Sequence, residues 1–108
     1  MSAEYLRLLD PRTITANDVQ PRDQVADLGA YRQLMIHLRL LKAGTAGNLL
    51  IQDAAVNEED AFRTIATISL SAASNPVEIT AFLRYVRWKA DTGVTGSPVV
   101  VVDLVAKE

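Results

Sequence analysis

The stretch Phe82-Leu-Arg-Tyr-Val-Arg-Trp-Lys-Ala90 decides the fold of this chain. The loop Asp91-Thr-Gly-Val-Thr-Gly-Ser-Pro98 follows it, and the apolar run Val-Val-Val-Val-Asp-Leu-Val comes next at residues 99–105. Glycine and proline mark turns, and short runs rich in β-branched and aromatic residues are typical of strands. This order therefore predicts two strands joined by a loop.

An α-helix is the competing interpretation of the same stretch. Asn75 and Pro76 are residue types that begin helices, and Gly93 is a type that ends them. The β-branched and aromatic residues between 77 and 88 instead prefer the pleated surface of a sheet. The same choice arises at residues 57–65, and strands are favoured at both places.

Alternate side chains of a strand lie on opposite faces, so the opening stretch divides into two rows. The row expected in the core contains Phe82, Val86 and Trp88. The row expected to face outward contains Tyr85, Arg87 and Lys89. Because tyrosine and arginine are enriched where interfaces carry their binding energy, we predict that the outward row contacts a partner. Exposed aromatic residues beside arginines would also suit stacking on sugar rings.

A second strand is predicted at residues 31–42. The even-numbered positions carry the aliphatic residues Leu34, Ile36, Leu38 and Leu40. Polar residues occupy the odd-numbered positions 33, 37 and 39. This period of two indicates a half-buried strand whose other face is wet or covered by a partner. Gln33, His37 and Arg39 therefore join the predicted interface.

Shorter strands are expected at residues 48–52, 64–70 and 77–80, with loops between them. Short strands at regular spacing, separated by turn signals, are typical of antiparallel sandwiches and barrels. We therefore predict an all-β protein, a small antiparallel β-sandwich of jelly-roll or immunoglobulin-like layout.

Residues 1–29 are expected to form an extended N-terminal arm, and residues 30–108 to form the sandwich domain. Within the arm, residues 5–9 favour a short strand that ends at Asp10-Pro11, because proline has no N–H to donate. A second short strand is expected at residues 13–15. The rest of the arm is polar and irregular, and segments of this length usually contact a neighbour.

Composition argues against several classes of protein. A net charge of −2 and a pI near 5.3 argue against binding to nucleic-acid phosphates, which needs a basic face. No apolar run is long enough to span a bilayer, and the first residues lack the pattern of a secretion signal. The absence of cysteine excludes disulfides, thiolate metal sites and a cysteine nucleophile.

No catalytic, metal or cofactor site is expected. His37 is the only histidine, and the sequence has no Gly-x-Ser-x-Gly motif to present a serine nucleophile. The acidic loop at residues 53–60 supplies oxygen ligands, but not at the spacing of a calcium loop and without its glycine. We expect a solvated turn there rather than a calcium site. The chain is therefore predicted not to be an enzyme.

Several short motifs occur in a particular order along the chain. They are Asp27-Leu-Gly-Ala-Tyr31, Leu49-Leu-Ile-Gln52, an acidic turn that reaches Phe62, the stretch 82–88, and Gly96-Ser-Pro98 before the last strand. This order resembles small β-sandwich structural proteins of tailed bacteriophages and prophages. The resemblance covers residues 27–108 and assigns no site residues.

The resemblance implies a non-enzymatic virion protein, most of all a head decoration (cement) protein that stabilises the phage head lattice. Its partner would be the major capsid protein or another virion protein, and neither nucleic acid nor a membrane is expected. A homo-oligomer is expected, and a trimer would suit symmetric capsid positions. The expected location is the virion, assembled in the host cytoplasm. The alternative is a carbohydrate- or receptor-binding β-sandwich module of a phage tail or cell surface.

Overall fold

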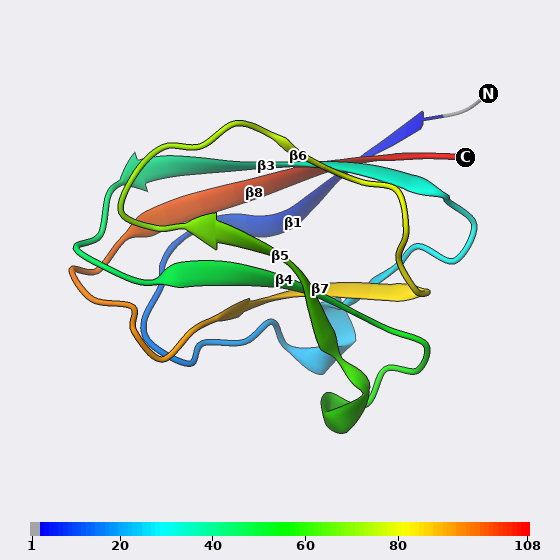
Figure 1. Ribbon diagram of the computed structural model, residues 1–108, viewed down its shortest axis with the longest axis horizontal. Helices are drawn as coiled ribbons and strands as arrows, with labels where there is room; N and C mark the ends of the chain where they lie inside the picture. The colour runs from blue at the N-terminus through cyan, green and yellow to red at the C-terminus, as the bar shows by residue number, and fades with distance from the viewer. Residues whose placement is uncertain (1–2) are drawn as a thin grey trace.

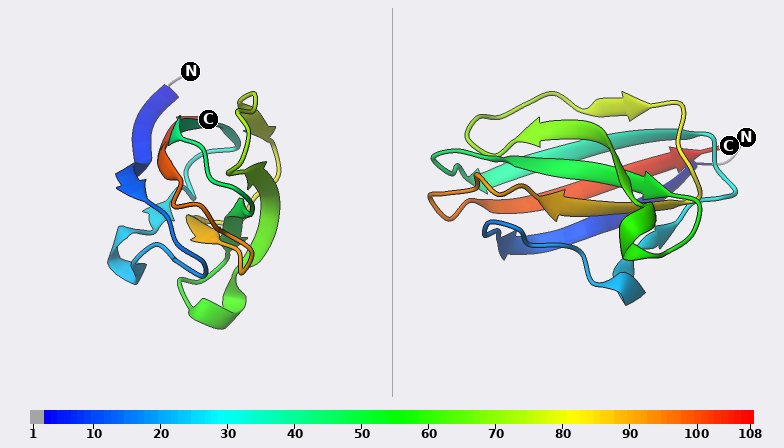
Figure 2. Two further views of the ribbon diagram at one scale, coloured as in Figure 1. Left: turned by 90° about the vertical axis from the view of Figure 1, so that its left-hand side faces the viewer. Right: turned by 60° about the horizontal axis from the view of Figure 1, so that its bottom comes forward.

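A computed structural model describes residues 3–108 of the chain, which form two four-stranded antiparallel sheets packed as a sandwich (Figure 1). The strand orders are β1-β8-β3-β6 and β2-β7-β4-β5. Figure 2 shows the two sheets as separate layers. The all-β prediction is confirmed, and strands also replace the helix considered for the opening stretch.

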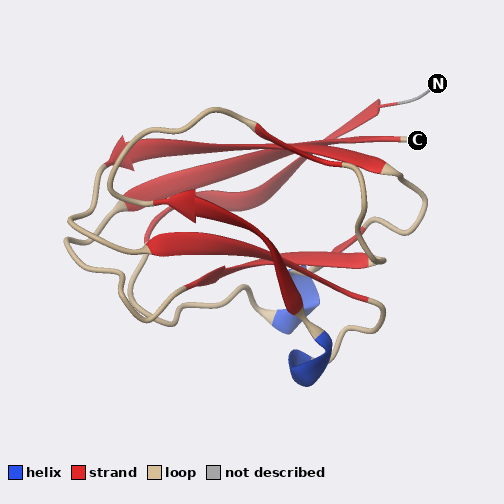
Figure 3. Cartoon of the chain, in the orientation of Figure 1, coloured by secondary structure: helices blue, strands red, loops and turns tan. Residues whose placement is uncertain are grey.

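The strands vary from two to eleven residues in length. Their bounds are β1 Ala3–Thr13, β2 Ala26–Asp27, β3 Gln33–Lys42, β4 Asn48–Ala54, β5 Arg63–Ser69, β6 Val77–Ile79, β7 Tyr85–Ala90 and β8 Val99–Lys107. Two single 3-10 turns, η1 Arg22–Gln24 and η2 Glu59–Ala61, are the helical segments drawn in Figure 3. Within residues 3–108, no helix has the length and apolar character needed to cross a membrane.

Strand β3 has the alternation that its sequence predicts. Leu34, Ile36 and Leu38 are buried, whereas Met35 and Arg39 are exposed. The inward residues face those of β8, in which Val100, Val102, Leu104 and Ala106 are buried. Alternation of this kind is expected where one face of a sheet packs on a core and the other does not.

Strand β7 places its inward row in the same core. Val86, Trp88 and Ala90 are each at most 1% exposed. Phe82 precedes the strand, is half-buried and packs against the core cluster. The core position predicted for Trp88 is therefore correct, and its indole is not available to stack on a sugar ring.

The N-terminal segment is more regular than its sequence suggests. Strand β1 extends from Ala3 through Asp10-Pro11 to Thr13, and pairs with β8 along its length. The register shifts between Arg7 and Leu9 and again before Arg12. Proline is tolerated in edge strands and at bulges, where its missing N–H breaks no ladder bond. The expected end of the strand at Asp10-Pro11 is therefore wrong.

The loops at one end of the sandwich pack closely on each other. Thr45 N donates to the carbonyl of Thr95 at 2.9 Å, and Thr95 N donates to the carbonyl of Ala46 at 3.1 Å. Gly47 has a φ of +99°, and a Cβ there would lie 2.4 Å from Cα of Val94. A side chain at this position is excluded both by the backbone conformation and by the neighbouring loop.

Candidate protein interface

The structure places the six predicted interface residues on opposite sides of the sandwich. Gln33, His37 and Arg39 lie on the outer face of the β1-β8-β3-β6 sheet. Tyr85, Arg87 and Lys89 lie on the outward side of the β2-β7-β4-β5 sheet. They therefore do not form one contact surface, and each face must be considered separately.

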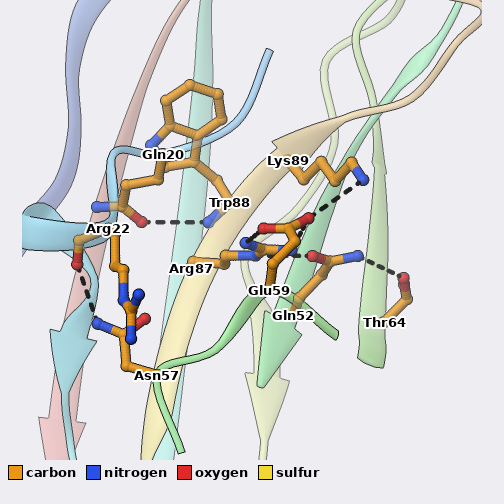
Figure 4. Close-up of polar contacts among 9 residues, drawn as sticks. All are labelled: Gln20, Arg22, Gln52, Asn57, Glu59, Thr64, Arg87, Trp88 and Lys89. Atoms are coloured by element: carbon orange, nitrogen blue, oxygen red, sulfur yellow. Dashed lines mark hydrogen bonds and ion pairs between the residues drawn. The ribbon is translucent and has the colours of Figure 1, made fainter. Parts of the chain in front are cut away.

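Arg87 is not an exposed contact residue, contrary to the prediction. It is 4% exposed, and its guanidinium donates to Glu59 through Nη1 at 2.6 Å and Nη2 at 3.2 Å. Its Nε donates to Oε1 of Gln52 at 2.9 Å. The ring of Phe62 lies 4.0 Å from the guanidinium carbon, close enough for a cation–π contact. Figure 4 shows Arg87 pointing toward Glu59 and Gln52.

The neighbours of Arg87 in the predicted row also make contacts within the chain. The ammonium nitrogen of Lys89 lies 4.0 Å from Oε1 of Glu59 (Figure 4). The guanidinium of Arg84 lies 5.1 Å from the centre of the Tyr85 ring. Residues 55–62 thus cover part of this face, and Arg87 serves to hold that loop in place.

The acidic residues of the 53–60 loop have separate structural tasks. Asp53 is fully buried and accepts hydrogen bonds from Arg63 Nε at 2.8 Å and from the backbone N–H of Leu83 at 2.7 Å. Glu59 pairs with Arg87, which lowers the pKa of the Glu59 carboxyl below its usual value. Within residues 3–108, no three acidic or histidine side chains gather as metal ligands would.

From here on, the term outer face means only the outward side of the β1-β8-β3-β6 sheet. Its side chains differ in kind from those on the outward side of the other sheet. Its central strand β8 presents Asp103 and Val105 between β1 and β3. Tyr5 and Met35 lie opposite Val105 on the two sides. Directly cross-strand side chains are near neighbours, so these three form an apolar row across the sheet.

Asp103 is the centre of a charged cluster beside that row. Its carboxylate accepts hydrogen bonds from the Tyr5 hydroxyl at 2.5 Å, from Arg7 Nε at 3.1 Å and from Arg39 Nη2 at 3.0 Å. The Tyr5 hydrogen bond contributes most to lowering the pKa of Asp103, followed by the two arginines. His37 lies opposite Asp103 in the register of β3 and β8. The carboxylate therefore fixes two guanidinium groups at the middle of the sheet.

Large side chains of this face are open to solvent. Tyr5 is 57% exposed and Met35 is 37% exposed. The side chains of Arg7 and Arg39 are 38% and 46% exposed. At the sheet's edge, Gln33 Nε2 donates to Oε1 of Glu78 at 2.6 Å. Tyrosine, methionine and arginine are enriched in protein interfaces, so this surface has the composition of a contact site.

Three residues of this cluster, Tyr5, Arg7 and Asp103, were not predicted from the sequence. One signal was present, since Asp103 is the only charged residue among the apolar residues 99–106. A charge in the middle of such a strand needs partners, because burial without them is costly. Those partners could not be identified, because Tyr5 is 98 positions away in the chain.

A cleft of about 270 Å³ lies at the open edge of the sandwich, between β1 and residues 23–28. Its lining is mixed and includes the buried Leu8 and Ala26 as well as the charged Glu4, Arg7 and Asp23. At its rim, the Tyr31 hydroxyl donates to Glu4, and Asp27 accepts two hydrogen bonds from Arg84. The outer face, which exposes Tyr5 and Met35 beside two arginines, is the stronger candidate for a contact site.

Comparison with solved structures shows a similar fold in the SPBc2 prophage-derived protein YomS, known from a crystal structure. The TM-score is 0.64 and the two sequences are 15% identical, over 98% of this chain and 94% of that one. At this identity the likeness concerns the fold alone. No protein-family model matches the sequence, and a search of curated proteins finds no match. The resemblance to phage and prophage proteins is thereby confirmed at the level of fold, for one prophage-derived protein.

Proposed function

We propose that this chain is a structural protein of a phage particle, a head decoration protein that binds the capsid lattice through its outer face. The observation that carries the proposal is the exposed Tyr5 and Met35 row beside the two arginines held by Asp103. The fold that the chain shares with a prophage-derived protein supports a phage context. The partner would be the major capsid protein or another virion protein.

A decoration protein acts by adding contacts across the seams of a lattice that has already assembled. One sheet face gives a modest area, but repeated copies on a lattice raise the effective concentration of every further contact. Homo-oligomers, trimers among them, would match the symmetry of capsid positions. Such a protein needs a broad contact surface, and the four hydrogen-bonded strands β1, β8, β3 and β6 supply one.

The alternative of a carbohydrate-binding module has less support. Trp88, the only tryptophan, is 1% exposed. Tyr85 is half-buried and already contacts Arg84. Sugar-binding surfaces stack rings on exposed aromatic faces, and neither of these side chains offers one. Tyr5 is 57% exposed, but it is a single ring whose hydroxyl is already bound to Asp103.

The proposal is tested by cosedimentation with phage particles purified from the source organism, with mass spectrometry of the particles to count copies of the chain. We expect the purified protein to sediment with particles, and the variants Tyr5→Ala and Met35→Ala to bind about tenfold more weakly. Val56→Ala is the matched control, because Val56 is 49% exposed and lies away from the outer face. Absence of the chain from particles, together with no cosedimentation, would overturn the proposal.

A further inference from the structure

The two arginines of the outer face keep hydrogen-bond donors that the chain does not use. Arg7 binds Asp103 through Nε, and Arg39 binds it through Nη2. Among the residues that the structure describes, neither Nη group of Arg7 nor Nε and Nη1 of Arg39 donates a hydrogen bond to the protein. A guanidinium has five N–H donors in a fixed plane, so most of these donors remain available.

One hydrogen bond to Asp103 holds each arginine at the middle of the face. Asp103 lies on the central strand, its side chain is 19% exposed, and it holds one arginine from β1 and one from β3. Long side chains lose conformational freedom when they bind, and that loss weakens binding. Because Asp103 has already restricted both arginines, less freedom is lost when a ligand arrives.

The charge of this cluster is positive, whereas the charge of the whole chain is −2. Two arginines meet one carboxylate at the centre of the face. Lys107 lies further along β8 on the same face, and Glu78 lies opposite Met35 on β6. The three cationic side chains outnumber the two acidic ones on this face, so it has a small positive charge and complements a negatively charged partner.

We propose that Arg7 and Arg39 bind carboxylate side chains of an acidic segment on the lattice protein, with Tyr5 and Met35 packing against apolar residues beside them. This inference rests on the proposed function and names the chemistry of the partner. A planar guanidinium matches a carboxylate through two parallel hydrogen bonds, which gives direction as well as attraction. The apolar row makes a protein a better fit than nucleic acid, whose recognition needs a broad basic surface.

The test is a titration followed by ¹H–¹⁵N NMR with the peptide Ac-(Gly-Glu)4-NH2, and with Ac-(Gly-Gln)4-NH2 as the uncharged control. We expect saturable shifts for backbone amides near residues 5–7, 35–39 and 101–105 with the glutamate peptide only. Binding should weaken severalfold between 20 mM and 300 mM salt, because exposed charges are screened.

Two variants test the arginines and the carboxylate that orients them. Replacing both arginines, in Arg7→Gln with Arg39→Gln, should weaken peptide binding about tenfold. Asp103→Asn removes the carboxylate that restricts both arginines, so more conformational freedom is lost on binding, and we expect the peptide to bind about threefold more weakly. Arg22→Gln is the control, since Arg22 is exposed on η1 and away from this face. The spectra of each variant also report whether it is folded.

Several results would overturn the inference. These are equal shifts with both peptides, shifts that map to another surface, tighter binding of a DNA duplex than of the glutamate peptide, and shifts of the same amides caused by the protein's own concentration. Particle binding that is unchanged by the double arginine variant would also overturn it, while leaving the proposed function intact. Peptide binding without cosedimentation would support the carboxylate site and contradict the decoration role.

Discussion

At the scale of single residues, Asp53 and Asp103 show how burial decides what a carboxylate does. Asp103 lies on an outward face, keeps contact with solvent and orients two exposed arginines. Asp53 is fully buried and binds Arg63 together with the backbone N–H of Leu83. The first arrangement prepares a surface for a partner, whereas the second joins strands β4 and β5 to the segment before β7.

Replacing Asp53 should therefore destabilise the fold. Asp53→Ala leaves the Leu83 N–H and the Arg63 guanidinium without their acceptor, and a lost partner of this kind costs about 2 kcal/mol. Urea denaturation should show this loss in the free energy of unfolding. Asp60→Ala is the control, since Asp60 is exposed in the same loop. Equal stability of the two variants would show that the buried carboxylate is not a structural link.

At the scale of elements, a strand could be predicted from the sequence where its own residues alternate between apolar and polar. It could not be predicted where its extent depends on pairing with a strand that is distant in the sequence. Strand β3 could be predicted because Leu34, Ile36 and Leu38 recur with a period of two. The length of strand β1 was underestimated, because a proline such as Pro11, considered alone, indicates the end of a strand. Its pairing with β8, at the other end of the sequence, keeps it extended beyond that proline. Pairing over such a separation leaves no local signal.

The position of the loop at residues 55–62 is likewise decided by contacts with a residue distant in the sequence. It lies over the β2-β7-β4-β5 sheet because Glu59 binds Arg87 and because Phe62 stacks on the same guanidinium. The alternation of β7 correctly placed Arg87 opposite the core. It could not show that a distant loop would cover that side chain, so the predicted exposure of Arg87 was wrong.

Neutralising Glu59 should loosen this loop with little effect on the rest of the sandwich. In Glu59→Gln, we expect faster hydrogen exchange of the Ala61 amide, which donates to the Glu58 carbonyl at 3.0 Å. Exchange in the core strands should stay the same. Glu58→Gln is the matched control in the same loop, because Glu58 is exposed. If both variants exchange alike, the ion pair with Arg87 does not hold the loop.

At the scale of the whole molecule, the sequence indicated two layers but not which strand belongs to which layer. A period of two separates inward from outward residues within each strand. It says nothing about whether the outward residues of β3 and β7 share a side. The six predicted interface residues were therefore divided between opposite sides of the sandwich, and of the cluster around Asp103 only Arg39 was predicted.

Three carboxylates give the whole molecule a defined response to acid. The pKa of Asp27 is lowered by Arg84, that of Glu59 by Arg87, and that of Asp103 first by Tyr5. A carboxyl whose pKa is lower in the folded state contributes stability that is fully present above its unfolded pKa, about 4. That contribution is lost as the pH falls through the folded pKa. Stability should therefore be nearly constant between about pH 5 and 7 and fall below about pH 4.

Urea midpoints measured at intervals from pH 2.5 to 7 check this response. The combined variant Asp27→Asn, Glu59→Gln and Asp103→Asn should show a shallower decline than the natural sequence. A decline of equal steepness in both proteins would assign the acid sensitivity to other carboxyls.

Ala3 and Lys107 are register partners, so the strands β1 and β8 meet at one end of the sheet, where the blue end of β1 and the red end of β8 lie in Figure 1. Tension applied between these two residues would separate β1 from β8 progressively, starting at this end of the sheet. It would load only one pair of backbone hydrogen bonds at a time. A force spread over the outer face would instead be shared by four paired strands. The molecule is thus mechanically soft when pulled by its ends and stiff when sheared across the surface proposed to meet the lattice.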